Sequence, residues 1–285
     1  MMEVVDAHLH LPSPRLDWPH GEASRRDLQA ELLLAQLDAA GVDAAVLVAV
    51  PGVAPVDECL EIAARHPDRV AVIAPWEGGE VSKEGEAPEG VLGVRLVLSW
   101  PPENAERLRS GGYDGLFDAA ERRGVPVSVL AGGLLPEIGE LARARPSLRL
   151  VVDHLGLDQP PYLPAGDPPW GGLPDLLALA GLENVAVKLS GAPTLSTGPY
   201  PYRDVWPHLD RVLSAFGADR CLWGSDAHRV SGRLRGFPPV PPYQGQHSHA
   251  QALHHLLDRS GLGDAERAAL FGGTARRVLG WPARP

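Results

Sequence analysis

Two histidines near the N-terminus are spaced so that both can act on one bound group. His8 and His10 close the segment VVDAHLH at residues 4–10, whose apolar, β-branched start predicts a buried strand. Alternate side chains of a strand share one face, and Pro12 and Pro14 then end the strand. Imidazole rings ligate metals and transfer protons, and burying two of them is costly unless they bind something. A bare His-x-His is equally consistent with two structural histidines, so other residues must decide.

Three further polar residues are expected within strands or at their ends. His154 directly follows one apolar run, Asp226 follows another, and Arg95 lies inside a third. Taken singly, an aspartate at a strand end often caps a loop, and a strand arginine often pairs with a buried carboxylate. Together with the two histidines, these residues predict one polar site.

The elements that must position these residues alternate regularly along the chain. Eight runs rich in Val, Leu and Ile predict strands that are buried on both faces. They are residues 3–7, 43–50, 69–74, 91–98, 125–130, 148–153, 184–189 and 220–225. Helical patterns lie between most of them, at residues 25–40, 57–65, 115–123, 135–145, 173–180 and 202–216. Gly41, Gly124 and Gly217 follow the last turns of three helices, where glycine commonly ends a helix.

This alternation predicts an α/β fold, a single-domain (β/α)8 TIM barrel over residues 1–285. Helices at about residues 248–280 are expected to pack on the barrel. The rival is an open doubly wound sheet, which ranks second because no Gly-x-Gly-x-x-Gly follows the first strand. A barrel places its first strand beside its eighth, and therefore brings His8 and His10 close to Asp226.

Composition limits the classes of partner. The 285 residues are 44% hydrophobic, which is ample for a large core, and the formal charge of −10 argues against nucleic-acid binding. No apolar stretch has the length of a membrane span, and no leader pattern precedes Glu3, so we expect a cytoplasmic protein without membrane contact. Two cysteines, Cys59 and Cys221, give no disulfide framework. The sequence leaves a homo-oligomer open.

Several segments together resemble the amidohydrolase superfamily, specifically its amidohydrolase-2 branch. They are DAHLH at residues 6–10, DHLG at 153–156, GSD at 224–226 and the closing LFGGTARRVLG at 270–280. Each is weak alone, but the resemblance extends over nearly the whole chain. DHLG and the segment VKLSG at 187–191 are similar to the group of sugar lactonases and 2-pyrone-4,6-dicarboxylate lactonase. The related decarboxylases usually show His-Gly-Gly at the sixth strand.

The resemblance implies a barrel of the metal-dependent hydrolase type, in which His8, His10 and Asp226 surround the reacting carbonyl. In many members these residues hold one divalent metal, Zn or Mn here, together with a histidine from the fifth strand. This sequence has Leu130 at that position. Three protein ligands still suffice for a catalytic zinc, but the lactonase group also implies members that work without metal. Both alternatives stay open.

The implied reaction is hydrolysis of a cyclic ester, either a sugar-acid lactone or a carboxylated lactone. Asp226 is the candidate general base, and His8, His10 and His154 are the other candidate catalytic residues. Arg95, Arg229 and Tyr202 are candidate substrate-binding residues for an anionic or sugar-derived small molecule. Lys188 is expected to pair with Asp226 or another carboxylate in the barrel.

Two other functions remain as alternatives. One is a metal-dependent non-oxidative decarboxylase, against which Leu130 and the absent His-Gly-Gly both count. The other is a barrel that binds without catalysis. The set of buried ionisable residues argues against it, because such groups are destabilising without a task.

Overall fold

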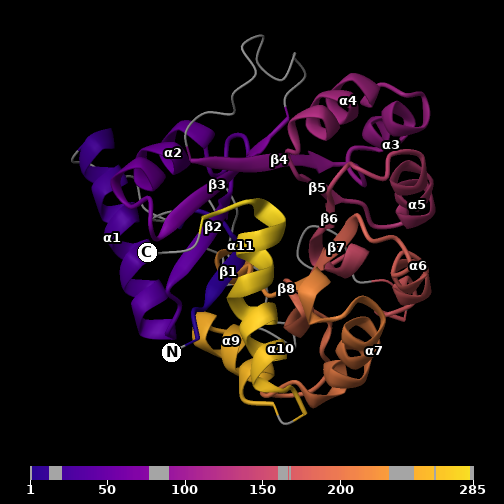
Figure 1. Ribbon diagram of the computed structural model, residues 1–285. Helices are drawn as coiled ribbons and strands as arrows, with labels where there is room; N and C mark the ends of the chain where they lie inside the picture. Colours follow the sequence, from indigo (N-terminus) through magenta and orange to yellow (C-terminus); the bar gives the residue numbers. More distant parts are fainter. Residues whose placement is uncertain are drawn as a thin grey trace.

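Eight parallel strands in the order β1 to β8 form a nearly closed barrel with helices around it (Figure 1). The computed structural model describes residues 2–12, 21–76, 90–159, 166, 168–230, 247–259 and 261–282. The strands are β1 Val5–Leu9, β2 Ala44–Val48, β3 Val70–Pro75, β4 Val91–Val97, β5 Val127–Leu130, β6 Leu150–Val152, β7 Val185–Lys188 and β8 Cys221–Leu222. All eight predicted strands are present, so the (β/α)8 TIM barrel is confirmed and the doubly wound sheet is excluded.

The seam between β1 and β8 completes the barrel. β8 has only two residues, so few ladder bonds are available there. The N–H of Ala7 donates to the carbonyl of Trp223 at 3.0 Å, and the N–H of Asp226 donates to the carbonyl of His8 at 2.9 Å. The backbone therefore ties the histidine strand directly to the segment that carries Asp226.

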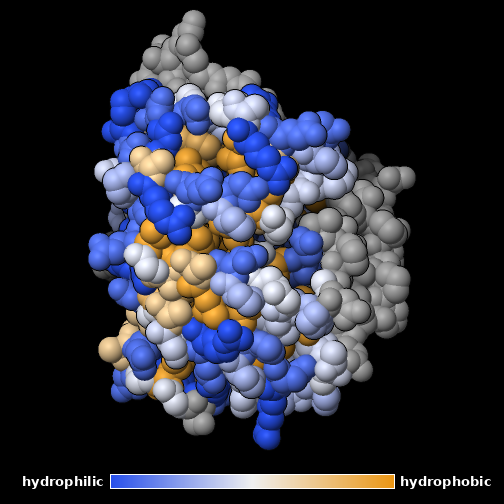
Figure 2. Space-filling model, turned by 90° about the vertical axis from the view of Figure 1, so that its right-hand side faces the viewer, coloured by the Kyte–Doolittle hydropathy of each residue, from blue (hydrophilic) through white to orange (hydrophobic). Residues whose placement is uncertain are grey.

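The outer ring of helices follows the predicted alternation. The helices are α1 Glu22–Ala40, α2 Val56–Arg65, α3 Pro102–Arg109, α4 Asp114–Arg123, α5 Leu135–Ala144, α6 Leu173–Ala178, α7 Trp206–Phe216 and α8 Ala227–Val230. The closing helices are α9 His249–Leu257, α10 Asp264–Ala268 and α11 Thr274–Leu279. Figure 2, which views the side of α3 to α7, shows hydrophobic side chains lying between hydrophilic ones. No helix of the described ranges is both long and apolar enough to cross a bilayer.

Two sequence predictions about helices were incomplete. Helix α3 was not predicted, because none of its residues is buried and its sequence therefore lacks an apolar period. The helix predicted at 202–216 begins at Trp206, with Pro207 in its first turn, where proline is well tolerated. A short 3-10 turn at Arg203–Val205 precedes it.

The first strand is irregular where the histidines begin. Its pairing register with β2 shifts between Asp6 and Leu9, as a β-bulge does when it re-aims a side chain. Asp6 contacts α9, whereas His8 contacts residues after β6, on the other side of the barrel. In a regular strand these two side chains would share a face, so the alternation expected for His8 and His10 does not extend back to Asp6.

The C-terminal helix closes the end of the barrel at which the strands begin. Ala275, Val278 and Leu279 of α11 belong to one apolar cluster with Val5 and Ala44 near the starts of their strands. In Figure 1 this helix crosses in front of β1 and β8. The packing leaves the carboxyl ends of the strands as the end where polar side chains gather.

Candidate active site

The structure brings together the four residues His8, His10, His154 and Asp226. The rings of His8 and His10 have centroids 5.3 Å apart, and those of His8 and His154 are 4.5 Å apart. Nε2 of His10 lies 3.5 Å from Oδ1 of Asp226, and Nε2 of His154 lies 3.8 Å from Oδ2. All four side chains are buried. The polar site expected from the sequence therefore exists as one cluster.

The two oxygens of Asp226 have different surroundings. Nε of Arg229 donates to Oδ2, whereas buried Oδ1 has no hydrogen-bond partner among the described residues. Asp226 also has a positive φ of 51°, which is uncommon for a residue other than glycine and typical of functional turns. Burial alone would raise the pKa of Asp226, but Arg229 and the neighbouring imidazoles outweigh it, so its pKa is lowered. At neutral pH the group is a carboxylate with one oxygen directed at the histidines.

The ring nitrogens of His8 and His10 fit a cation. His10 Nδ1 lies 2.7 Å from the carbonyl oxygen of Val48, which fixes its proton there and leaves a lone pair on Nε2. Neither buried ring nitrogen of His8 has a hydrogen-bond partner in the described part of the chain. One ligand atom from each of His8, His10 and Asp226 lies within 4.8 Å of the others. Unpartnered buried nitrogen and oxygen atoms of this kind are the donor set that zinc prefers.

His154 is held by an unusual backbone and by a serine. His154 and Leu155 have φ values of 54° and 62°, two successive non-glycine residues in the left-handed region. The Ser190 hydroxyl, at the end of β7, accepts the backbone N–H of His154 at 3.3 Å and lies 2.9 Å from its Nδ1. The hydroxyl hydrogen is then available to Nδ1, which leaves the proton of the neutral ring on Nε2, facing Asp226.

A buried ion cluster lies next to His8. Oδ2 of Asp153 accepts a hydrogen bond from Nε of Arg95 at 2.7 Å, and its Oδ1 lies 3.1 Å from Nζ of Lys188. Nδ1 of His8 is 3.5 Å from the same Oδ1. Burial would raise the pKa of Asp153, but Lys188 and Arg95 hold it well below its usual range. Of the two partners that the sequence left open for Lys188, the structure selects Asp153, not Asp226.

Burial sets the protonation state of the histidines. Removal from water lowers the pKa of His8, His10 and His154 below the ordinary value of 6.5. All three rings are therefore neutral at neutral pH. A neutral imidazole can ligate a metal through one nitrogen or donate a hydrogen bond to a developing oxyanion.

The three predicted substrate-binding residues differ in their surroundings. Arg95 is mostly buried, and only its Nε has a hydrogen-bond partner among the described residues, so its two terminal nitrogens are available. Arg229 donates to Asp226 through Nε and to Oε1 of Gln159 through Nη2 at 2.8 Å. Tyr202 is buried, with its ring 6.2 Å from His247 and 6.0 Å from His255. The substrate-binding roles stay predictions.

Several residues of the site were not predicted. Asp153, Ser190 and Gln159 hold Arg95, His154 and Arg229, and Asp6 holds the backbone of His8. Asp153 had a signal in the sequence, because a buried Arg95 needs a carboxylate and Asp153 ends a buried run. Ser190 and Gln159 had none, because their contacts join segments far apart in the chain.

His255, which borders Tyr202, gives a pH dependence of stability. Burial lowers the pKa of His255 from 6.5 to about 3, so between these values only the unfolded chain binds the proton. The free energy of unfolding should fall by about 1.4 kcal/mol for each pH unit below the ordinary value. Urea unfolding at about pH 7.5 and pH 5 should show that the free energy of unfolding depends less on pH in His255→Phe than in wild type. Equal dependence in both proteins would contradict the assignment.

Comparison with known proteins agrees with the fold and with the family resemblance that the sequence segments indicated. The model of the amidohydrolase family matches residues 5–281. A crystal structure of an amidohydrolase from Burkholderia multivorans with bound zinc superposes with a TM-score of 0.74 at 22% identity, over 98% of this chain and 100% of that one. This likeness shows a shared fold.

Two curated relatives are named as lactone hydrolases. An L-fucono-1,5-lactonase of Burkholderia ambifaria is 34% identical over 144 residues, which are 50% of this chain and 44% of that protein. A 4-sulfomuconolactone hydrolase of Rhizobium radiobacter is 28% identical over 236 residues, 78% of this chain and 74% of that protein. The first match thus spans less than half of its relative. Because the family model covers the chain almost from end to end, we conclude that this protein belongs to the amidohydrolase family.

Proposed function

We propose that the protein hydrolyses a lactone, with Asp226 as the general base. The observation that carries this proposal is the buried carboxylate of Asp226, whose unpartnered Oδ1 lies 3.5 Å from Nε2 of His10. The lactone hydrolases among the relatives support the same reaction class. A cyclic ester needs a polarised carbonyl, an activated water and an anchor for the substrate, and the site contains residues suited to each task.

In the proposed mechanism, Asp226 accepts a proton from the attacking water as the oxygen–carbon bond forms. The carbonyl electrons move to oxygen, and an N–H on Nε2 of neutral His154 donates a hydrogen bond to the developing oxyanion. The carbon–oxygen bond of the ring then breaks, and the proton passes from Asp226 to the leaving oxygen. The product is a hydroxy acid, and the carboxylate is restored.

We further propose that His8, His10 and Asp226 hold one divalent ion, Zn²⁺ or Mn²⁺. The ring nitrogens of His8 and Oδ1 of Asp226, which have no hydrogen-bond partner among the described residues, support this assignment. Such an ion would polarise the carbonyl and lower the pKa of a bound water. Leu130 ends β5, where a fourth protein ligand was expected, so three protein ligands remain.

The charges around the site favour a substrate that carries an anion. Among the described residues, Arg95 and Lys188 share the single carboxylate of Asp153, which leaves one positive charge in excess there. Arg229 balances Asp226, and the imidazoles are neutral. The free fork of Arg95 matches the geometry of a carboxylate. We therefore propose a sugar-acid lactone or a carboxylated lactone as substrate.

A panel of lactones tests both the reaction and the substrate class. Wild-type protein should open carboxylated lactones faster than neutral ones of equal ring size, measured by acid release with a pH indicator. Arg95→Lys keeps the charge but loses the fork, and a charged hydrogen bond contributes about 1.5–3 kcal/mol. We expect kcat/KM for the carboxylated lactone to fall by about 10–150-fold. The value for a neutral lactone should change little.

Each alternative function gives a different result in this panel. An unsaturated or an aromatic acid is tested beside the lactones. Release of carbon dioxide from this acid, without lactone opening, would favour the decarboxylase. Binding of lactones without turnover would favour the non-catalytic barrel. An equal loss for carboxylated and neutral lactones in Arg95→Lys would contradict the anchoring role of Arg95.

Metal binding is tested separately from activity. Protein stripped with a chelator should bind one equivalent of Zn²⁺ or Mn²⁺ per chain in a competition titration. His8→Asn and His10→Asn should weaken metal binding by at least about 10–100-fold. Loss of a residue that only orients a metal ligand already costs this much. His254→Gln, at a partly exposed histidine of α9, is the matched control. Full lactone turnover by the stripped protein would instead favour the metal-free route.

A further inference from the structure

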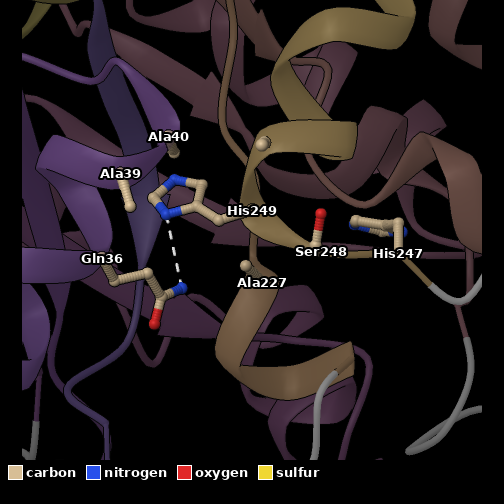
Figure 3. A pocket seen from close by; sticks show the side chains of 8 residues that line it. Gln36, Ala39, Ala40, Ala227, His247, Ser248 and His249 are labelled. Atoms are coloured by element: carbon tan, nitrogen blue, oxygen red, sulfur yellow. Dashed lines mark hydrogen bonds between the residues drawn. The ribbon is translucent and has the colours of Figure 1, made fainter.

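Behind the site, polar side chains from four elements form one hydrogen-bonded chain. Nε2 of His249 lies 2.9 Å from Oδ2 of Asp6, and its Nδ1 lies 3.3 Å from the amide of Gln36. The other end of this amide lies 2.9 Å from Nε2 of His228, whose Nδ1 contacts the carbonyl oxygen of His10. Figure 3 shows Gln36 of α1 and His249 of α9 facing each other across this contact.

Both ends of the chain reach backbone that carries the site. Oδ1 of Asp6 accepts the N–H of His8 at 3.0 Å and the N–H of Ser225 at 2.9 Å. The Ser225 hydroxyl donates to Oδ2 of Asp6 and accepts the N–H of Ala227 at 3.1 Å. Asp6 therefore holds the bulge of β1 and the turn that contains Asp226. His228 holds the carbonyl of His10.

We propose that the chain of contacts from Asp6 through His249 and Gln36 to His228 positions the site. His249 and Gln36 are positioning residues: they fix Asp6, and Asp6 fixes the backbone on which His8 and Asp226 are presented. The chain ends at a backbone carbonyl, so it does not conduct protons to the reacting atoms. The clamp that Asp6 forms on the His8 and Ser225 amides is independent of the proposed reaction, whereas its effect on turnover rests on that reaction.

Gln36 offers a change that spares the core. It is half-buried on α1 and lines a cavity of about 330 Å³, together with Ala39, Ala40, Ala227 and His249 (Figure 3). Gln36→Ala therefore enlarges an existing cavity and creates no new one. The exposed Glu31 lies on the same helix, so Glu31→Ala is a matched control.

The first test measures the effect of positioning on turnover. Gln36→Ala and His249→Leu should lower kcat for the lactone by about 10–100-fold, with little change in KM. This is the typical loss when a hydrogen-bond partner that orients a residue of the site is removed. His249→Gln, which keeps an N–H for Asp6, should retain more turnover than His249→Leu. Losses no larger than in Glu31→Ala, or confined to KM, would overturn the positioning role.

Hydrogen exchange separates failure of this proposal from failure of the proposed function. If wild-type protein opens no lactone, the exchange of the His8 and Ser225 backbone amides still reports the clamp. We expect both amides to exchange at least tenfold faster in His249→Leu than in wild type, and unchanged rates would refute the clamp.

Discussion

Replacement of Asp226 by asparagine should lower kcat for a carboxylated lactone by about 10²–10⁴-fold, the contribution of a positioned general base. Asparagine has nearly the same shape, and its amide oxygen can still accept the hydrogen bond of Arg229. It cannot accept a proton from water, and it replaces the unpartnered Oδ1 that lies near His10. Steady-state kinetics with a pH indicator measures the change, and KM should change little because Arg95 remains in place.

The control for this variant is an aspartate far from the chemistry. Asp175→Asn, at an exposed position of α6, makes the same chemical change and should leave kcat unaltered. Near-normal turnover in Asp226→Asn would show that another group accepts the proton. The assignment of Asp226 as general base would then be wrong, although the fold and the family would stand.

The second large effect concerns stability. Asp153→Asn should lower the free energy of unfolding by about 3–5 kcal/mol, the typical cost of removing one partner of a buried ion pair. Asp153 is fully buried, and its carboxylate contacts both Arg95 and Lys188. Without the carboxylate, two buried cations face each other with no opposite charge. Urea unfolding followed by circular dichroism measures the loss.

A second variant shows whether uncompensated charge is the cause. Lys188→Met alone leaves Asp153 paired with Arg95, so it should cost less than Asp153→Asn. The double variant Asp153→Asn/Lys188→Met should recover part of the stability, because one unpaired cation is gone. A loss below about 1 kcal/mol for Asp153→Asn, or no recovery in the double variant, would contradict this account.

These two predictions separate catalysis from architecture within one polar cluster. Among the described residues, Oδ1 of Asp226 has no hydrogen-bond partner, whereas Oδ2 and Oδ1 of Asp153 lie 2.7 Å and 3.1 Å from nitrogens of Arg95 and Lys188. The first arrangement suits proton transfer, and the second suits a fixed scaffold. A variant of Asp153 can also disturb turnover, because His8 lies 3.5 Å from it, so stability has to be measured alongside rate.

Much of the fold could be predicted because it follows from local pattern. Strands buried on both faces need continuous apolar residues, and all eight such runs became strands. Helix α3 was missed for the same reason, since a helix with no buried residue has no apolar period. The register shift in β1 could not be predicted either, because Asp6, where it begins, contacts Ser225 from the opposite end of the chain.

The sequence by itself determined which residue types stand at the strand ends, and hence that His8, His10, His154 and Asp226 could meet. Only the tertiary structure decided what each of them faces. It pairs Asp153 with Lys188, turns His154 onto Ser190 and places His249 on Asp6. The physical reason is that a strand's period fixes the direction of a side chain only relative to its own backbone. Partners brought from distant segments by barrel closure decide which atoms remain free for chemistry.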